Sequence, residues 1–475
     1  MSENGAQNQN HFDVVVIGGG PGGYAAALYG ASAGLDVALV EYDKIGGTCL
    51  HRGCIPAKEL LETAAIVRAV KHAGDFGVMV EQKSVEWNVT LERKQAVIDR
   101  LAGGVTGLLK NRKVTMFNGF GTLHPDRVVK IKGVDGQSET VTGETVILAS
   151  GSTPRVIPGF EPDGSTVVTS DEFLELAQIP STAVVIGGGA IGCEFASTLA
   201  DLGAKVTILE ALPKILPGCD EDVTRVVLQA FKKKGIEVRA GASVTGHTPR
   251  PGGGTSVKVD GEVAPIEADL VVVSVGRVPF TNGVLAEGTG VQVSPRGHIE
   301  VDELCRTGVP SVWALGDVIN TPQLAHVAFA EAIMVIKDIL GENPPAIDYG
   351  KVPWAIYCHP EVAFAGYSQS AAQEAGYDVV VSKHRFAGNS RAQILGETDG
   401  LVKIIAQKNA DGSAGRILGV HMVGPWVTEQ LSGGYLAVNW EATVDDVAYL
   451  LQPHPSLTEL FGESVLSLTG RSLHG

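Results

Sequence analysis

The chain has 475 residues, which is enough for roughly three domains. It carries 37 Lys and Arg against 53 Asp and Glu, and this formal charge of −16 argues against binding to nucleic acids or anionic membranes. No apolar stretch is long enough to span a bilayer, and six cysteines are too few for a disulfide scaffold, so we expect a cytoplasmic protein. Residues 1–11 are polar and are expected to form a flexible tail.

The first motif is typical of a nucleotide site. A strand, a glycine turn, a helix, a strand and an acid follow in residues 12–17, 18–23, 24–33, 37–40 and 41. Gly18, Gly20 and Gly23 allow a tight turn, the approach of a pyrophosphate and close packing of the helix. The N–H groups at the helix start would bind the phosphates, and Glu41 would accept hydrogen bonds from a ribose.

Two cysteines, Cys49 and Cys54, lie five positions apart directly after this module. Pro56 is tolerated in the first turn of a helix, so we expect a helix to begin near Cys54 and to place that thiol at its positive end. This position favours the thiolate, and a low-pKa thiol beside a second thiol is typical of a redox pair. The missing secretory context disfavours a structural disulfide, and the lack of further cysteine ligands disfavours zinc. Two inert core cysteines are the remaining alternative.

The order of strand, glycine turn, helix, strand and acid recurs between residues 183 and 210. From first glycine to acid the distance is 23 positions in both modules (18 to 41 and 187 to 210). Two such fingerprints favour two bound dinucleotides over ordinary glycine-rich turns. Glu210 would hold a free ribose hydroxyl and repel a 2′-phosphate, so we expect NAD rather than NADP here. The glycines of this module are Gly187, Gly189 and Gly192.

Further segments suggest the architecture. Strands are expected to run into turns over residues 144–151, 269–277 and 311–317. Ligands in open α/β sheets lie beyond the carboxyl ends of strands, so Asp317 is placed for a cofactor hydroxyl, with a capping aspartate as the alternative. After about residue 350, β-like runs (400–406 and 415–423) and helical runs (426–440 and 444–451) indicate a separate α+β domain. We therefore expect an α/β protein with two Rossmann-like dinucleotide-binding domains and a C-terminal α+β domain.

Near the end of the chain, His454 stands between two prolines ahead of an expected helix. An imidazole suits proton transfer near neutral pH, and a carboxylate such as Glu459 would fix its tautomer. The alternatives are a surface loop histidine and a capping box in which Glu459 pairs with Ser456.

Taken together, these residues resemble the flavoprotein disulfide reductases, the class I pyridine nucleotide-disulfide oxidoreductases, and within them the branch that oxidises dihydrolipoyl groups. The resemblance runs from about Phe12 to the last helix. The segments that carry it are Gly46–Lys58, Ile191–Glu194, Val275–Arg277, Leu315–Asp317, Leu324–His326, His359–Val362 and His454–Pro455 with Glu459.

The resemblance implies FAD and NAD as cofactors and a role for each matching residue. Cys49 would exchange with the substrate disulfide, Cys54 would face the flavin, and His454, oriented by Glu459, would act as base on the redox pair of the other subunit. Lys58 would lie near the flavin and pair with Glu194. The FAD contacts would be Gly18, Gly20, Gly23, Glu41, Gly47, Thr48, Lys58, Gly121, Ser150, Gly151, Asp317 and Ala325. The NAD contacts would be Gly187, Gly189, Gly192, Glu194, Glu210, Val244 and Gly276.

The resemblance also implies a domain order and partners. An FAD-binding part (12–154), an NAD-binding domain (155–280), a return to the FAD side (281–350) and a dimerisation domain (351–475) would follow one another. The active site would be shared between the subunits of a homodimer. The partner would be the lipoyl domain of a 2-oxoacid dehydrogenase or glycine-cleavage complex, and no metal, membrane or nucleic acid is expected.

The implied activity is oxidation of dihydrolipoyl groups with reduction of NAD⁺ through a Cys49–Cys54 disulfide. The chain departs from this branch in three residues. Gln452 stands where a histidine is usual, and His51-Arg52 replace Asn-Val between the cysteines. The alternatives are a related reductase of disulfides, quinones or metal ions, and a non-catalytic flavin-binding subunit.

Overall fold

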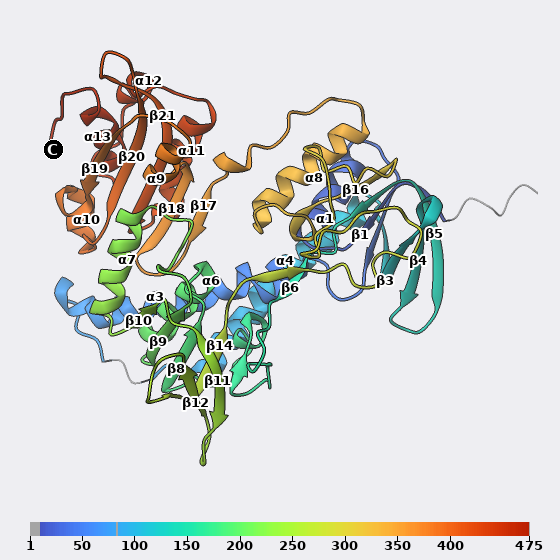
Figure 1. Cartoon of the computed structure of the whole chain (residues 1–475), viewed down its shortest axis with the longest axis horizontal. Coiled ribbons are helices and arrows are strands. Elements are labelled where there is room, and N and C mark those ends of the chain that lie inside the picture. Colours follow the sequence, from blue (N-terminus) through green and yellow to red (C-terminus); the bar gives the residue numbers. More distant parts are fainter. Residues whose placement is uncertain (1–9, 82–83, 475) are drawn as a thin grey trace, which may run out of the picture. The chain divides into compact units, whose positions relative to one another are not determined.

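The computed structural model describes residues 10–81 and 84–474, so the first nine residues of the expected tail lie outside the described residues. The last two residues of that expected tail belong to the folded part instead. Asn10 Nδ2 donates to the Thr140 carbonyl at 3.1 Å, and His11 opens the first strand. The described residues form two compact units, the first comprising residues 10–59, 88–155 and 276–349 and the second the rest (Figure 1). Among the described residues, no helix is both long and apolar enough to cross a membrane.

The first unit is built on a six-stranded sheet. Its strands are β1 (His11–Ile17), β2 (Val37–Glu41), β3 (Thr115–His124), β4 (Val128–Gly133), β5 (Ser138–Leu148) and β16 (Val312–Ala314). β1 pairs in parallel with β2 and β5, while antiparallel β4 joins the end of β3 to the start of β5. Val14, Val15 and Val16 of β1 are completely buried, as expected for a parallel strand covered on both faces.

Helices α1 (Pro21–Ser32) and α8 (Ala325–Ile339) pack against each other beside this sheet (Figure 1). Pro21 begins α1, at a position where the missing N–H removes no helical hydrogen bond. A Cβ built on Gly22 would lie 2.3 Å from Leu315 Cδ1, so glycine lets the start of α1 approach the loop that carries Asp317. The other elements with residues in this unit are α2 (Gly47–Arg52), α3 (Cys54–His72), α4 (Trp87–Asn111), β6 (Ser152–Pro154), β15 (Arg277–Pro279), and the 3₁₀ turns η2 (Pro125–Arg127), η3 (Gly316–Val318) and η4 (Tyr349–Lys351).

The second unit contains a five-stranded parallel sheet in the order β10-β9-β8-β14-β7. A three-stranded antiparallel sheet, β11-β12-β13, accompanies it. The elements are β7 (Val167–Val168), α5 (Ser170–Phe173), β8 (Thr182–Ile186), α6 (Ala190–Asp201), β9 (Lys205–Glu210), α7 (Glu221–Lys233), β10 (Glu237–Ala240), β11 (Val244–Pro249), β12 (Thr255–Val259), β13 (Ile266–Ala268), β14 (Leu270–Val273) and the turn η1 (Ala73–Phe76).

The C-terminal part of the second unit is an antiparallel sheet in the order β17-β18-β21-β20-β19, with α11 packed on β18 and β21 and α13 packed on β19 and β20. Its elements are β17 (Trp354–Ile356), β18 (Glu361–Gly366), α9 (Gln369–Glu374), β19 (Val379–Arg385), η5 (Phe386–Gly388), α10 (Ser390–Leu395), β20 (Leu401–Lys408), β21 (Ala414–Gly424), α11 (Val427–Asn439), α12 (Val444–Ala448) and α13 (Glu459–Ser467). The expected helix over 444–451 ends early, at Ala448, and the side chains of Tyr449, Leu450 and Leu451 that follow it are exposed. The expected fold class is confirmed: two α/β parts built on parallel strands, and a C-terminal α+β part.

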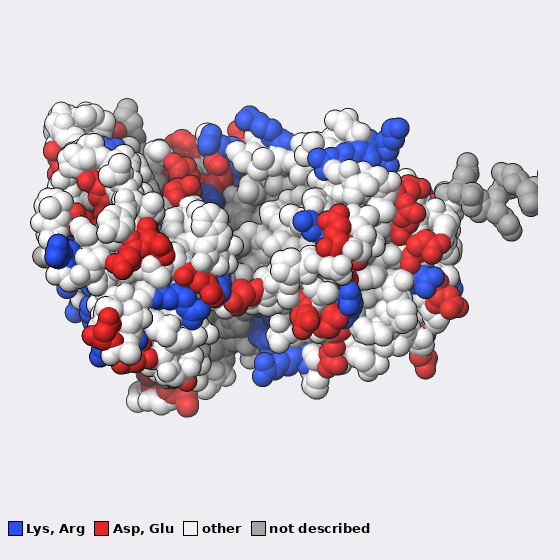
Figure 2. Space-filling model, turned by 90° about the horizontal axis from the view of Figure 1, so that it is seen from above, with Lys and Arg blue, Asp and Glu red and all other residues white. Residues whose placement is uncertain are grey.

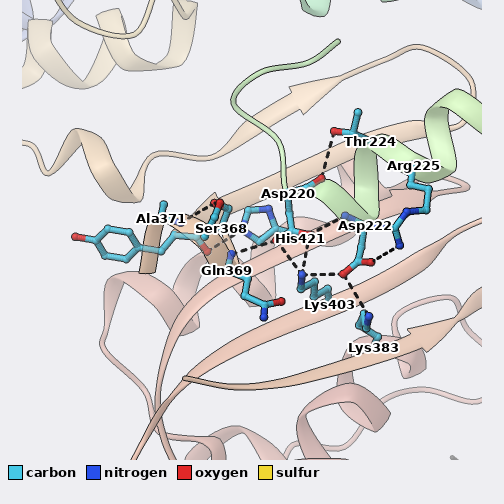
Figure 3. Close-up of polar contacts among 12 residues, drawn as sticks. Asp220, Asp222, Thr224, Arg225, Ser368, Gln369, Ala371, Lys383, Lys403 and His421 are labelled. Carbon is cyan, nitrogen blue, oxygen red and sulfur yellow. Dashed lines mark hydrogen bonds and ion pairs between the residues drawn. The ribbon is translucent and has the colours of Figure 1, made fainter. Parts of the chain in front are cut away.

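A buried ion cluster joins α7 to the antiparallel sheet within the second unit (Figure 3). Lys403 Nζ donates to both carboxylate oxygens of Asp220, at 2.8 and 2.9 Å, and to Asp222 Oδ2 at 2.8 Å. The Lys403 and Asp220 side chains are 2% and 3% exposed. Burial raises the pKa of Asp220, but hydrogen bonds from Lys403 and from backbone N–H groups outweigh it and hold the pKa below its usual value.

Charged side chains of both signs are interspersed over the face that Figure 2 shows. The sequence has an excess of acidic residues, yet on this face they are spread among basic and uncharged ones. The net negative charge is therefore not gathered there into a single acidic patch.

Candidate functional site

The first glycine turn has the geometry of a phosphate cradle. Gly18 has φ +106°, and a Cβ there would lie 2.2 Å from the Ala149 carbonyl oxygen, so only glycine fits. A Cβ on Gly23 would lie 1.8 Å from the Gly18 carbonyl oxygen, which explains the close contact of helix and turn. Gly20, by contrast, faces open space at the start of α1, where the helix N–H groups point outward. The residues present therefore fit a dinucleotide pyrophosphate.

The second glycine turn repeats this geometry. A Cβ on Gly187 would lie 2.5 Å from the Ser274 carbonyl oxygen, and a Cβ on Gly192 would lie 2.0 Å from the Gly187 carbonyl oxygen. Gly189 faces open space at the start of α6. The two turns match position for position, as the sequence motif suggests, and this one too fits a pyrophosphate.

The acid that ends each second strand holds its own glycine turn. Glu41 Oε2 accepts the Gly19 N–H at 2.6 Å, and Oε1 accepts the Asp43 N–H at 2.7 Å. Burial raises the pKa of Glu41, and these backbone hydrogen bonds oppose that effect. Glu210 does the same, with Oε2 on the Gly188 N–H at 2.6 Å and Oε1 on the Leu212 N–H at 2.7 Å. Each oxygen keeps a lone pair that can accept a hydrogen bond from a ribose hydroxyl. Ribose binding by Glu41 and Glu210 stays a prediction.

The two cysteines lie on two successive helices, whereas the sequence predicted only the second. Residues 47–52 form the short helix α2, which carries Cys49, and α3 begins at Cys54 as expected from Pro56. The sequence gives no sign of α2, because a run with two glycines at its start lacks a helical apolar pattern. Gly47 has φ +56°, and a Cβ there would lie 2.6 Å from Gly20 Cα. The redox helix therefore starts directly against the first glycine turn.

Cys49 and Cys54 are both partly buried and lie beside each other. A hydrogen bond with Cys54 raises the pKa of the Cys49 thiol, burial raises it further, and the nearby Lys58 charge lowers it. Burial, together with the nearby sulfurs of both cysteines, raises the pKa of Tyr24 to about 12. Tyr24, on α1, is thus a neighbour of the redox pair that sequence reasoning did not find.

His51 and Arg52, which depart from the family pattern, link α2 to the loop that follows β2. His51 Nε2 is 2.9 Å from the Ile45 carbonyl oxygen, and the Arg52 guanidinium forms an ion pair with Asp43. Both contacts lead to the loop that follows β2. This pair thus joins the redox helix to the strand end that carries Glu41.

Asp317 lies in a chain of hydrogen bonds within the first unit. Ser152 Oγ donates to Asp317 Oδ2 at 2.6 Å, and Arg277 Nε donates to Ser152 Oγ at 2.7 Å. Arg277 Nη2 also reaches Thr48 Oγ1, at 3.5 Å, beside Cys49. The Asp317 side chain does not cap η3, so the capping alternative is not realised. Arg277 was not among the predicted site residues, although the Val275–Arg277 motif contains it.

The other predicted FAD contacts are spread along the first unit. Ser150 Oγ donates to the Phe280 carbonyl at 2.6 Å, and the Gly151 carbonyl accepts the Phe280 N–H at 2.9 Å. Gly121 lies in β3, where a Cβ would meet Val40 Cγ1 at 3.0 Å, and Ala325 is the first residue of α8. Their contacts with FAD stay predictions.

Three further predicted NAD contacts lie in different parts of the chain, and their contacts with NAD stay predictions. Glu194 is 4% exposed, and its Oε1 accepts the Tyr357 N–H at 2.9 Å, which gives this carboxylate a role in packing. Val244 begins β11, whereas Gly276, with φ +98°, belongs to the first unit.

The predicted acid–base pair is formed in the second unit. His454 Nδ1 and Glu459 Oε1 are 2.8 Å apart, and the His454 side chain is 71% exposed. Glu459 Oε2 accepts the Ser456 N–H at 2.8 Å, while the Ser456 side chain does not complete a capping box. Burial raises the pKa of Glu459, but hydrogen bonds from Ser456 and His454 outweigh it and lower the pKa. The contact between His454 and Glu459 is therefore present, whereas only the Glu459 half of the capping box is formed. The acid–base role of the pair stays a prediction.

Comparison with known proteins identifies this arrangement. Residues 12–332 match the family described as pyridine nucleotide-disulphide oxidoreductase, and residues 352–465 match its dimerisation domain. The chain is 40% identical to a dihydrolipoyl dehydrogenase of Bacillus subtilis over 98% of its own length and 99% of that protein. It is 36% identical to the mitochondrial dihydrolipoyl dehydrogenase of Canis lupus familiaris, with 97% and 92% covered.

Solved structures agree with this match. LpdA from Mycobacterium tuberculosis superposes with a TM-score of 0.90 at 25% identity, covering 97% of this chain and 99% of that one. The HOCl-induced flavoprotein disulfide reductase RclA from Escherichia coli, solved as its Cu(II) complex, gives 0.85 at 26% identity over 97% and 99%. The chain belongs to the pyridine nucleotide-disulphide oxidoreductase family.

Proposed function

We propose that the protein is a homodimeric dihydrolipoyl dehydrogenase that uses FAD and NAD. The observation that carries the proposal is the contact of Gly47 with Gly20, because it places the helix of Cys49 against the first glycine turn. A thiol pair beside a dinucleotide cradle is arranged for electron exchange between sulfur and a bound flavin. The full-length relatives at 36–40% identity support the lipoyl substrate.

The chain's residues account for the thiol chemistry. His454, held by Glu459, accepts a proton from a dihydrolipoyl thiol, and the resulting thiolate attacks Cys49 Sγ of a Cys49–Cys54 disulfide. The S–S bond breaks, and Cys54 leaves as a thiolate. The second lipoyl sulfur then displaces Cys49, and its proton passes to the departing Cys49 sulfur. The proton held by His454 passes to the Cys54 thiolate, and the lipoyl group leaves oxidised. The cysteine pair has then gained two electrons as a dithiol.

Each cofactor site has residues suited to its part. FAD, when bound, supplies an acceptor for the electron pair of the dithiol and a hydride donor to NAD⁺. The positive charge of Lys58 lowers the pKa of Cys49 and so opposes the rise that the Cys54 hydrogen bond and burial cause. Glu210 favours NAD over NADP, since its carboxylate would repel a 2′-phosphate and the next three residues include no arginine.

The proposed partners follow from the family. The match to a dimerisation domain supports a homodimer, in which His454 of the partner subunit would serve each redox pair. The exposed imidazole of His454 suits such a role. The lipoyl domain of a 2-oxoacid dehydrogenase or glycine-cleavage complex would bring the substrate, and the cysteine content favours the cytoplasm.

The test compares the purified holoenzyme with a Cys49→Ser variant. Wild type should reduce NAD⁺ with dihydrolipoamide, and the variant should keep its yellow FAD yet lose turnover, because no disulfide can form. Cys219→Ala, a buried cysteine of the second unit, serves as the matched control and should stay active. Turnover by Cys49→Ser would contradict the redox assignment.

The same preparation separates the alternatives. Faster turnover with glutathione disulfide, quinone or mercuric ion than with lipoamide would indicate a related reductase. Anaerobic titration with a dithiol should consume one electron pair for the disulfide and a second for the flavin. Uptake of the flavin pair alone would indicate a non-catalytic flavin-binding subunit.

A further inference from the structure

A buried glutamate that no motif singles out lies behind the Asp317 turn. Glu331, on α8, is completely buried. Its Oε2 accepts the Gly316 N–H at 2.6 Å, and its Oε1 accepts the Tyr349 hydroxyl at 2.9 Å. Gly316 directly precedes Asp317, so the Glu331 carboxylate fixes the backbone next to the Asp317 side chain.

The network continues away from the turn. Tyr349 ends the first unit, and its hydroxyl is hydrogen-bonded to the Cys305 thiol, which is 1% exposed. Burial raises the pKa of Glu331, and the hydrogen bonds from Gly316 and Tyr349 oppose that rise. A buried acceptor with two fixed donors specifies one position for each donor.

The opposite side of the turn is fixed by other contacts. Ser152 Oγ holds Asp317 Oδ2, and the Leu315 N–H donates to the Leu148 carbonyl at 3.0 Å. Gly316 thus lies between two residues that other contacts hold in place. In the described structure, its N–H donates to Glu331 alone. Without Glu331, that half-buried N–H would lose the acceptor that the structure gives it, and we expect the turn to relax.

We infer that Glu331 is a positioning residue for the FAD site, which sets the Gly316–Asp317 turn so that the Asp317 carboxylate can accept a cofactor hydroxyl. The inference rests on the proposed FAD site, because it concerns how that site is prepared. Asp317 would touch the cofactor, whereas Glu331 acts only through the backbone of Gly316. Its loss should weaken FAD binding more than it weakens the fold.

The test measures FAD affinity of the apoprotein, by titration followed through flavin fluorescence and the visible circular dichroism of the bound flavin. Glu331→Ala should bind FAD about tenfold to a hundredfold more weakly, which is the usual effect of leaving such an N–H unpaired. Glu331→Gln keeps an acceptor oxygen for Gly316 and should recover most of the affinity. If Glu331→Ala folds poorly, Tyr349→Phe removes one donor to the same carboxylate and should weaken binding a few-fold.

Asp338 provides the matched control on the same helix. Its carboxylate is also buried and accepts hydrogen bonds from Arg306 and Trp313, but it does not reach the Asp317 turn. Asp338→Ala should lower the unfolding temperature and leave FAD affinity unchanged. Equal loss of affinity in Asp338→Ala and Glu331→Ala, or none in Glu331→Ala, would overturn the inference. Failure of the wild-type apoprotein to take up FAD would instead overturn the proposed function, and the inference with it.

Discussion

At the scale of single residues, one carboxylate in each glycine module orders the glycine turn. Glu41 and Glu210 each use both oxygens to hold backbone N–H groups, one of them in the glycine turn. The turn is therefore ordered before a ligand arrives, which reduces the entropy lost on binding. The predicted hydrogen bond to a ribose hydroxyl would use the lone pairs that remain, so one side chain would couple ribose recognition to phosphate binding.

His359 provides a prediction about stability and pH. Burial lowers its pKa to about 2, and the positive charges of Lys234, Arg68 and His72 lower it in the same direction. The unfolded chain takes up a proton at this residue below about pH 6.5, whereas the folded chain does not. The stability that the neutral ring contributes is thus complete above pH 6.5 and is lost as the pH falls.

We expect the wild-type free energy of unfolding to fall more steeply below pH 6.5 than that of His359→Asn, by about 1 kcal/mol for each pH unit. Urea unfolding at several pH values between 7 and 5 would measure the two slopes. Parallel slopes would show that His359 takes up its proton equally well in the folded protein.

The residues that could be predicted are those whose role is local. The glycine turns and the His454–Glu459 pair depend on backbone geometry or on partners five positions apart, so a short motif contains all the information. Arg277 and Glu331 were missed for the opposite reason. Arg277 reaches Thr48, 229 positions away, and Glu331 resembles any glutamate in an apolar helix until the fold buries it.

At the scale of elements, the buried cluster of Figure 3 joins α7 to a strand of the antiparallel sheet. Lys403 and Asp220 are 183 positions apart, so no pattern in the sequence pairs them. The strand that carries Lys403 was expected over residues 400–406, because hydrophobic periodicity is local, whereas α7 was not among the expected elements. Their pairing could not be predicted, because it depends on which side chains the tertiary fold encloses.

Removing one member of this cluster should be costly. Lys403→Met leaves Asp220 buried without its cation, and we expect the free energy of unfolding to fall by about 3–5 kcal/mol. Lys233→Met on α7 is the control, since its ion pair with Asp399 is exposed, and it should cost less than about 1 kcal/mol. Urea unfolding followed by tryptophan fluorescence measures both. A similar small loss in the two variants would show that the buried cluster adds nothing beyond an exposed pair.

At the scale of the whole molecule, the proposed catalytic set is divided between the two units of the chain. Cys49 and Cys54 belong to the first unit, and His454 and Glu459 belong to the second. His454 lies within residues 352–465, which match the dimerisation domain of the family. In a twofold dimer, the proposed base His454 of each subunit would act on the cysteines of the other subunit, and two complete sites would form by symmetry.

Mixed dimers test this division directly. Cys49→Ser and His454→Gln homodimers should each be nearly inactive. A mixed dimer of the two has one site that carries both replacements and one that carries neither, if the site is shared. Random mixing after dissociation should therefore restore about a quarter of wild-type turnover with dihydrolipoamide and NAD⁺.

The control replaces Cys49→Ser by the double variant Cys49→Ser/His454→Gln in the same mixture. No arrangement of its subunits contains an intact site, so any activity there would reveal exchange with wild type or residual turnover. Mixed dimers isolated with two different affinity tags allow the active fraction to be assigned to the heterodimer itself. Inactive heterodimers of the single variants would place the cysteines and the histidine of each site in one subunit, since every site would then carry one replacement.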